Sequence, residues 1–179
     1  MILENYQIKL KRVEFEDLEY IRIARNSDFV RKNMIYQKII SKKEQQEWFK
    51  KINNPENFYF VIIHKSEKVG LINLKDVNME NKSAEGGIFL FSREFASNDI
   101  SMRASIMLTD FGFYELNLKK ILNRVRKDNI LAIRFNKAIG YSFHELDSNV
   151  LVGELFLDEY EKFASRYRNL FNKLYNLTN

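Results

Sequence analysis

Residues 125–141 read VRKDNILAIRFNKAIGY, and this stretch decides the predicted fold. The apolar residues of segment 120–125 predict a strand, and residues 131–138 predict a short helix. Gly140 lies just past that helix, where a left-handed glycine commonly ends it. Residues 141–146 then predict a second strand. A strand, a short helix and another strand in succession indicate an α/β domain.

The segments on both sides of this unit predict a mixed sheet with helices. Residues 58–63 and 69–74 flank a polar turn and predict a hairpin, and residues 84–91 predict a third antiparallel strand. Ser41 and Glu44 fit a capping box that opens a helix as far as residue 52. The other predicted elements are a strand at 6–13, helices at 17–26 and 27–31, a long helix at 100–115, a strand at 150–157 and a C-terminal helix at 158–175 that Asp158 caps. We therefore expect one α/β domain, residues 1–179, with about seven strands.

Composition narrows the classes of function. The chain has no cysteine, which excludes disulfides, thiolate metal sites and a cysteine nucleophile. Its net charge of +5 is spread among interspersed acidic residues, which fits a phosphate-bearing small ligand and is too weak to indicate nucleic acid. No apolar stretch approaches the roughly 20 residues of a membrane span, so we expect no membrane contact and a cytoplasmic location. We expect no metal site, and His64 and His144 lie at predicted strand edges.

Three patterns together resemble the GNAT superfamily of N-acetyltransferases. Residues 25–49 look like the acceptor-side helices of the branch that acts on ribosomal N-termini, polyamines and amino-sugar nucleotides. They look most like the enzymes that acetylate 4-amino sugar nucleotides in pseudaminic acid biosynthesis. Residues 84–90, AEGGIFL, are similar to the fourth strand of the family. The stretch 125–141 resembles the family segment N-x-x-A-I-x-x-Y-x-x-x-G-F, with Asn129 as its asparagine.

The resemblance implies an acyl-CoA-dependent N-acetyltransferase that uses acetyl-CoA and whose fourth and fifth strands splay apart. Backbone groups of the fourth strand would bind the pantetheine arm and polarise the thioester, since a preorganised N–H stabilises the charge that develops on its oxygen. Gly86 and Gly87 fit close ligand approach and fit a bulge or packing glycines equally well. Asn129 would lie beside the coenzyme arm and also cap its helix. The coenzyme-binding residues implied are Ile88, Phe89, Leu90, Ala96, Ser97, Asn98, Asp99, Ile100, Ser101, Asn129 and Ala132.

Two departures from the family pattern fall on this site. The family loop reads R/Q-x-x-G-x-G/A and cradles the pyrophosphate with bare backbone amides, whereas residues 96–101 read ASNDIS. Asp99 takes a glycine position, and its carboxylate would repel a diphosphate unless Arg103 or Arg93 compensates. The alternative is that Asp99 simply caps the next helix. Asn136 replaces the tyrosine that protonates the leaving thiolate, and an amide can donate a hydrogen bond to sulfur but no proton.

Glu85 and Asn136 are the expected catalytic residues. Glu85 is the carboxylate on the presumed reactive strand and could take a proton from the acceptor amine through water, although a surface glutamate has the same pattern. Candidate substrate-binding residues are Arg25, Asn26, Met34 and Trp48, which offer charge for a diphosphate and an aromatic face for a ring.

Several functions remain open at this level. The leading hypothesis is acetyl transfer to a primary amine of a small substrate by direct attack in a ternary complex, with an amino-sugar nucleotide preferred over a polyamine or a protein N-terminus. The glycine-free loop also allows a non-catalytic GNAT-like binding module. The aromatic stripe of the C-terminal helix fits packing on its own sheet or a homodimer contact.

Overall fold

The computed structural model describes residues 1–175, apart from the side chain of Ser97. Its elements, in chain order, are β1 (Ile2–Asn5), β2 (Ile8–Arg12), the 3-10 helix η1 (Phe15–Asp17), α1 (Leu18–Asn26), α2 (Asp28–Arg31), α3 (Lys42–Ile52), β3 (Phe58–His64), β4 (Glu67–Asn78), β5 (Ser83–Leu90), the 3-10 helix η2 (Glu94–Ser97), α4 (Ile100–Asp110), the π-helix η3 (Phe111–Glu115), β6 (Lys120–Arg126), α5 (Ile130–Lys137), β7 (Ser142–Glu145), β8 (Val150–Phe156) and α6 (Leu157–Tyr175).

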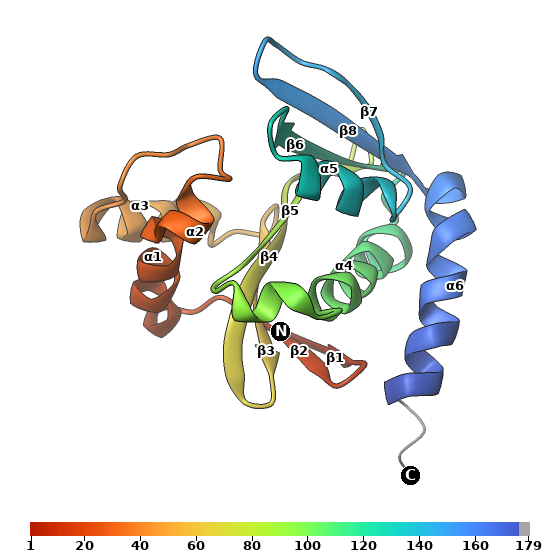
Figure 1. Ribbon diagram of the computed structural model, residues 1–179, viewed down its shortest axis with the longest axis horizontal. Helices are drawn as coiled ribbons and strands as arrows, with labels where there is room; N and C mark the ends of the chain where they lie inside the picture. The colour runs from red at the N-terminus through yellow and green to blue at the C-terminus, as the bar shows by residue number, and fades with distance from the viewer. Residues whose placement is uncertain (176–179) are drawn as a thin grey trace.

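The strands form one mixed sheet in the order β1-β2-β3-β4-β5-β6-β8-β7. Helices α1 to α3 lie on one face of the sheet, and α4, α5 and α6 lie on the other (Figure 1). The larger core fills the α4–α6 side and includes Phe60, Ile106, Leu155 and Tyr160. A smaller core, which includes Ile21, packs α1 and α3 on the opposite face. Among residues 1–175, no helix is both long and apolar enough to cross a membrane.

The one parallel pairing in the sheet, between β5 and β6, is short. Ser83, Ala84 and Glu85 pair with Lys120, Ile121 and Leu122, after which the two strands part. Strand β5 continues to Leu90 and β6 to Arg126. These strands correspond to the fourth and fifth of the predicted set, so the expected splay is confirmed.

The helix ends follow the predicted local chemistry. Ser41 Oγ accepts from the Glu44 backbone N–H at 3.2 Å, and the Glu44 carboxylate accepts from the Ser41 N–H at 2.7 Å, which completes the capping box. Asn129 caps α5 through its Oδ1, which accepts from the Ala132 N–H at 3.1 Å. Gly140 follows α5 with a φ of +113°, a conformation that favours glycine.

Three boundaries differ from the prediction. The sheet has eight strands instead of about seven, because residues 2–12 form a hairpin whose turn residues, Tyr6 and Gln7, have φ values of 52° and 57°. Neither residue is a usual left-handed turn former, so the sequence gives no turn signal there. The predicted helix at 100–115 becomes π-helical from Phe111. Helix α6 begins at Leu157, so Asp158 lies in its first turn and does not cap it.

The C-terminal helix packs on its own molecule. Tyr160, Ala164 and Phe171 of α6 are buried in the larger core, which accounts for one side of the aromatic stripe. Phe163 and Leu170 on the same helix are exposed. A homodimer contact through that outer side stays a prediction.

Candidate functional site

The divergence of β5 and β6 is the feature around which the site is built. From Gly86 to Leu90, β5 pairs with β4, and within residues 1–175 no strand pairs with its other edge. Backbone N–H and C=O groups need partners, so an unpaired strand edge is a ready binding surface for an extended ligand. Ile88, Phe89 and Leu90, expected to contact the pantetheine arm, all lie on this stretch.

Two helix N-termini lie at the end of this opening. Helix α4 follows β5 and begins at Ile100, and α5 follows β6 and begins at Ile130. Because β5 and β6 run parallel, both helices begin at the same end of the sheet (Figure 1). A helix N-terminus presents unsatisfied N–H groups and partial positive charge, which suits phosphate. Asn129 also donates through Nδ2 to the carbonyl of Asn33 at 3.4 Å, which connects α5 with the loop after α2.

The glycine-free loop before α4 has a definite hydrogen-bonded form. Asn98 Oδ1 accepts from the Ile100 N–H at 3.0 Å. Asp99 occupies the N-cap position, but its carboxylate makes no cap bond; it pairs with Arg103 at 3.0 Å and accepts from the Tyr175 hydroxyl at 2.6 Å. Asp99 is therefore the N-cap residue of α4 by position but not through its side chain, and of the two arginines considered, Arg103 is the one that pairs with its carboxylate. Ala96 lies in η2 and Ser101 in the first turn of α4, while the side chain of Ser97 lies outside the described part.

Glu85 is the last residue of β5 that pairs with β6, and its side chain is 17% exposed. Residues alternate between faces along a strand, so Glu85 shares the α1–α3 side with Phe89, which packs against the smaller core. Its carboxylate lies 3.1 Å from Lys75 Nζ and 3.6 Å from Arg124 Nε. These contacts and its limited exposure distinguish Glu85 from an ordinary surface glutamate.

Tyr59 and Trp48 lie on the same face as Glu85. Their rings are in edge-to-face contact, 5.2 Å between centroids. Burial, followed by the charge of Asp76, raises the pKa of Tyr59 to about 12, and the nearby Glu85 carboxylate adds to this rise. Trp48 is half-buried and packs against Tyr59, the ring that senses the charge of Glu85.

Of the other three predicted substrate-binding residues, Arg25 and Asn26 are the last two residues of α1 and Met34 lies in the loop after α2. Asn26 uses both amide atoms on the backbone of Ile40, at 2.8 Å each, and therefore fastens the loop. Arg25 donates to the carbonyl of Tyr36 at 2.6 Å, and burial lowers its pKa. Its Nη1 is buried and has no hydrogen-bond partner in the described part of the chain. Met34 is half-buried in the loop itself. The structure thus gives Arg25 and Asn26 loop-holding contacts.

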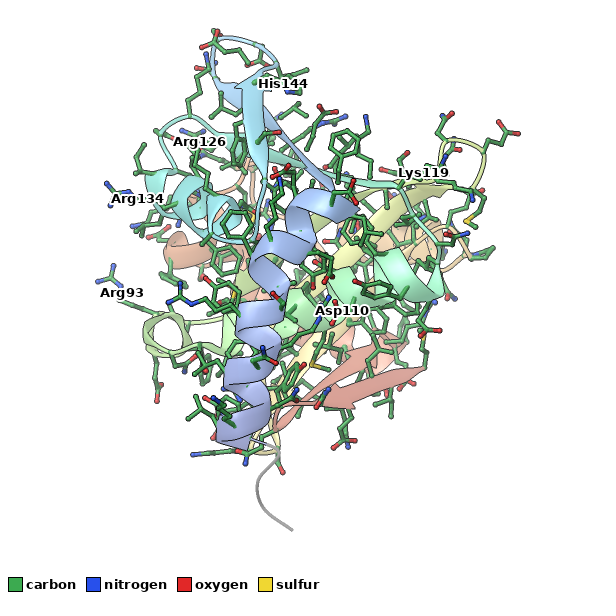
Figure 2. The ribbon with its side chains drawn as sticks, turned by 90° about the vertical axis from the view of Figure 1, so that its right-hand side faces the viewer. Arg93, Asp110, Lys119, Arg126, Arg134 and His144 are labelled. Atoms are coloured by element: carbon green, nitrogen blue, oxygen red, sulfur yellow. The ribbon has the colours of Figure 1, made fainter. Side chains whose placement is uncertain are left out.

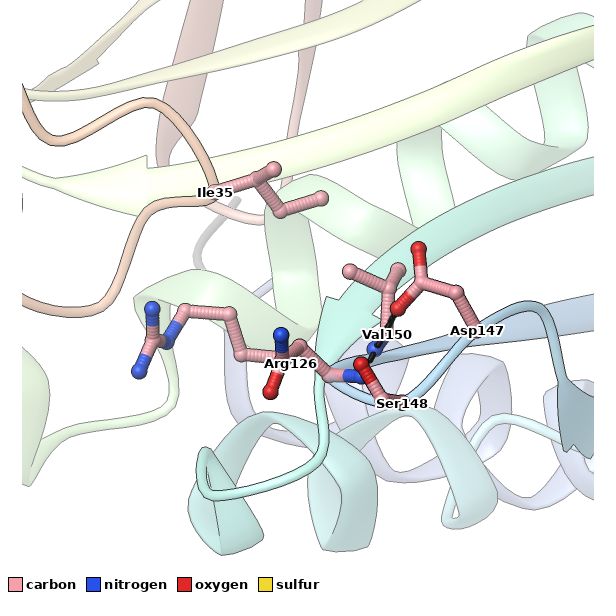
Figure 3. A pocket seen from close by; sticks show the side chains of 6 residues that line it. Ile35, Arg126, Asp147, Ser148 and Val150 are labelled. Carbon is pink, nitrogen blue, oxygen red and sulfur yellow. Dashed lines mark hydrogen bonds between the residues drawn. The ribbon is translucent and has the colours of Figure 1, made fainter.

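A hollow of about 420 Å³ lies between this loop, the end of β6 and the β7–β8 turn (Figure 3). Its lining residues, none of which the sequence singles out for substrate, are Ile35, Arg126, Asp147, Ser148, Asn149 and Val150. Arg126 forms an ion pair with Asp128. Asp147 Oδ1 accepts from the backbone N–H groups of Asn149 and Val150 at 2.7 and 2.9 Å, so this oxygen is bonded within its own turn.

Two side chains are candidates for a hydrogen bond to a leaving thiolate, and of the two only a tyrosine hydroxyl could also give up a proton. Asn136 donates its amide to the carbonyl of Ala132 at 2.8 Å, inside α5. Tyr141 is 9% exposed, and a methyl group built on Gly86 would lie 3.6 Å from its hydroxyl, close to where β5 and β6 part. Burial raises the pKa of Tyr141, and its hydroxyl has no hydrogen-bond partner within residues 1–175. Tyr141 was not singled out from the sequence. The one signal in the sequence is that Tyr141 stands at the last position of the family segment, where the family pattern has phenylalanine.

Basic side chains follow one edge of the molecule. Arg93, from the turn before η2, Arg134, from α5, and Arg126, from the end of β6, project on the same side in Figure 2. Arg93 and Arg134 are exposed, and neither has an ion pair in the described residues. Guanidinium groups bind phosphate through paired hydrogen bonds, so this edge suits a ligand with several phosphates.

Residues 1–175 contain no group of three or more histidine, aspartate or glutamate side chains placed to hold a metal ion.

Comparisons with known proteins agree with this geometry. The family described as Acetyltransferase (GNAT) domain matches residues 7–142. The curated spermidine N(1)-acetyltransferase of Escherichia coli K12 is 28% identical over 165 residues, which are 92% of this chain and 83% of that protein.

Solved structures share the fold. Spermidine N-acetyltransferase from Vibrio cholerae, in complex with CoA and spermine, has a TM-score of 0.74 at 22% identity and covers 88% of this chain and 99% of its own. An apo structure of a nucleotide-linked sugar GNAT has a TM-score of 0.78 at 22% identity, covering 94% and 97% of the two chains.

Proposed function

The chain belongs to the GNAT acetyltransferase family, and on this premise we propose that it transfers an acetyl group from acetyl-CoA to a primary amine of a small substrate. The unpaired edge of β5, which opens toward two helix N-termini, is the observation that carries this proposal. Such an edge can bind the amide-rich pantetheine arm, and the helix ends suit a diphosphate. The exposed Arg93 and Arg134 are placed for the remaining phosphate charge.

We propose direct attack in a ternary complex. The amine nitrogen bonds to the thioester carbonyl carbon, the carbon–sulfur bond breaks, and coenzyme A leaves as a thiolate that takes a proton. Glu85 takes the proton that the amine loses, through water, and backbone N–H groups of Ile88–Leu90 stabilise the carbonyl oxygen. Tyr141 donates a hydrogen bond or proton to the departing sulfur. Asn136 can donate the expected hydrogen bond to sulfur only if its amide breaks the hydrogen bond that it makes with the Ala132 carbonyl.

An amino-sugar nucleotide is the preferred acceptor because the carboxylates on the acceptor side are already engaged by cations or by backbone N–H groups, so few are left to bind a polyamine. Glu85 is held between Lys75 and Arg124, and Arg126 lines the hollow beside the opening. Asp147 is the acidic residue of that lining, and one of its oxygens is bonded to its own turn. A sugar diphosphate would be attracted to this surface.

Spermidine is the second candidate, supported by the curated relative that acetylates it and by the V. cholerae neighbour that binds spermine. A polyamine carries several positive charges at neutral pH and needs carboxylates near its chain. Glu85 would be the first of these, if the acceptor displaced Lys75 or Arg124 from it.

Thiol release from acetyl-CoA, measured with a panel of amines, decides between these substrates. The panel contains a nucleoside-diphosphate-linked 4-amino sugar, spermidine and a peptide with a free N-terminus. For the sugar nucleotide we expect the Arg126→Ala variant to raise KM by roughly fivefold or more, and for spermidine to leave KM unchanged or lower it. Arg166→Ala, on the exposed side of α6, is the matched control. Silence with every amine, despite demonstrated acetyl-CoA binding, would leave the non-catalytic binding module as the function.

A further inference from the structure

We propose that Tyr175 and Arg103 are positioning residues that hold the Asp99 carboxylate away from the diphosphate site, so that a loop without glycine binds coenzyme A. This inference rests on the proposed use of acetyl-CoA. It assigns a role in coenzyme binding to the C-terminal helix, which lies outside the region that matches the family.

Asp99 needs such control because of its place in the chain. It immediately precedes α4, whose N-terminal N–H groups and partial positive charge attract any nearby anion. A free carboxylate there would compete with the ligand's phosphates for the same donors, and it would also repel them. A diphosphate site at this helix end therefore requires the charge of Asp99 to be neutralised and its oxygens to be engaged elsewhere.

Both oxygens of Asp99 are engaged on the α6 side of the helix. Oδ1 lies 3.0 Å from Arg103 Nη2, one turn further along α4. Oδ2 accepts a hydrogen bond from the Tyr175 hydroxyl at 2.6 Å. The hydrogen bond with Asp99 is also the largest cause of the raised pKa of Tyr175. The carboxylate is therefore paired and oriented before any ligand binds.

Arg103 is itself fixed in this position. Its side chain is 3% exposed, and Nη1 donates to the carbonyl of Tyr6 at 2.8 Å. Its guanidinium carbon lies 4.3 Å from the ring centroid of Tyr175, a cation–π contact. Tyr175 thus contributes twice, through its hydroxyl to Asp99 and through its ring to Arg103. A ligand phosphate could bind Arg103 only if the arginine gave up its contacts with Asp99, Tyr6 and Tyr175. Arg103 therefore neutralises Asp99 and does not bind the ligand.

The test uses separate variants for the Tyr175 hydroxyl, for the charge of Asp99 and for general effects on the fold of α6. Tyr175→Phe keeps the ring over Arg103 and removes only the bond to Asp99. Asp99→Asn removes the charge of the carboxylate. The variant with both substitutions completes a double-mutant cycle, which measures the coupling between Tyr175 and Asp99. Tyr167→Phe is the matched control, because Tyr167 lies on the same helix and its hydroxyl has no hydrogen bond within the described residues. Calorimetric titration with CoA reports binding without any acceptor, and kinetics with acetyl-pantetheine report the site without a diphosphate.

We expect Tyr175→Phe to raise the Kd for CoA roughly tenfold, the size of one lost hydrogen bond to a charged group. The KM for acetyl-pantetheine should not change, and the double variant should bind CoA within about twofold of Asp99→Asn, as additivity fails for coupled residues. Unchanged CoA binding in Tyr175→Phe, equal weakening toward acetyl-pantetheine, or no rescue by Asp99→Asn would each overturn the proposal. Absence of CoA binding by the unmodified protein is a different result and would reject the proposed function itself.

Discussion

Replacing Arg168 with methionine tests how α6 is fixed to the rest of the protein. Arg168 bonds to Asp110 at 3.1 Å through Nε and at 2.5 Å through Nη2, and to Glu161 at 3.0 Å through Nη1 and 2.7 Å through Nη2. Asp110 lies at the end of α4 and faces α6 in Figure 2. It also accepts from the Tyr160 hydroxyl at 2.7 Å. The arginine therefore links two carboxylates, one from each helix.

The size of the effect follows from these contacts and their exposure. A hydrogen bond to a charged group contributes about 1.5–3 kcal/mol when buried. The side chains of Arg168, Asp110 and Glu161 are 23%, 27% and 39% exposed, so solvent screening reduces each pairing to about 1 kcal/mol. Methionine keeps the apolar stem but leaves Asp110 with Tyr160 alone, which adds a desolvation cost of about 1 kcal/mol. We expect the free energy of unfolding to fall by about 2–3 kcal/mol and Tm by roughly 5–10 °C.

Urea denaturation followed by circular dichroism measures this loss. Arg166→Met is the matched control, because Arg166 is exposed on the same helix and has no ion pair within residues 1–175. The control should change the free energy of unfolding by less than about 0.5 kcal/mol. If Arg168→Met lost no more than the control, the four hydrogen bonds from Arg168 to carboxylates would not stabilise the docked helix, and the reasoning would be refuted.

Three further predictions concern the proposed chemistry and the pH dependence. Glu85→Gln should lower kcat by about 100-fold or more, whereas Glu154→Gln, a strand carboxylate also paired with a lysine, should not; a small loss in Glu85→Gln excludes the base. Tyr141→Phe should lower kcat by roughly tenfold and leave the KM for acetyl-CoA unchanged, and an unchanged kcat would show that the hydroxyl does not assist the leaving group. The hydrogen bond from Arg168 lowers the pKa of Glu161, so its stabilisation is present above the unfolded pKa of about 4.3 and is lost as pH falls through the lower folded value. The stability gap between the unmodified protein and Arg168→Met should therefore narrow below about pH 4, and a gap independent of pH would contradict this.

Local patterns were sufficient for most of the fold. The capping box at Ser41 and the glycine after α5 act within a few residues, so the sequence shows them directly. The first hairpin was missed because its turn is made by Tyr6 and Gln7, which have left-handed backbone conformations although neither is a residue type that favours them. Tertiary packing of Tyr6 in the larger core supplies a constraint that no local signal carries.

The residues of the candidate site were harder to predict from the sequence than the fold. Strand alternation alone could not place Glu85, because its face depends on which helices cover the sheet. Tyr141 was hidden for a similar reason, since a tyrosine at a core position usually serves packing, and only the approach of Gly86 places its hydroxyl where β5 and β6 part. The hollow beside Arg126 joins three segments that are distant in the chain, so its lining could not be deduced from spacing.

Asp99 shows most clearly why a sequence departure does not by itself argue against a function. The sequence identifies the problem, an acidic residue in place of glycine at a helix N-terminus that should bind phosphate. The compensation lies partly four residues away, in Arg103, and partly 76 residues away, in Tyr175. A helix partner four residues away can be expected from periodicity, but a contact with the last turn of α6 depends on how that helix docks. If the Asp99–Tyr175 bond sets the coenzyme affinity, variants that loosen α6, such as Arg168→Met, should also weaken CoA binding, and they should do so less when Asp99 is already asparagine.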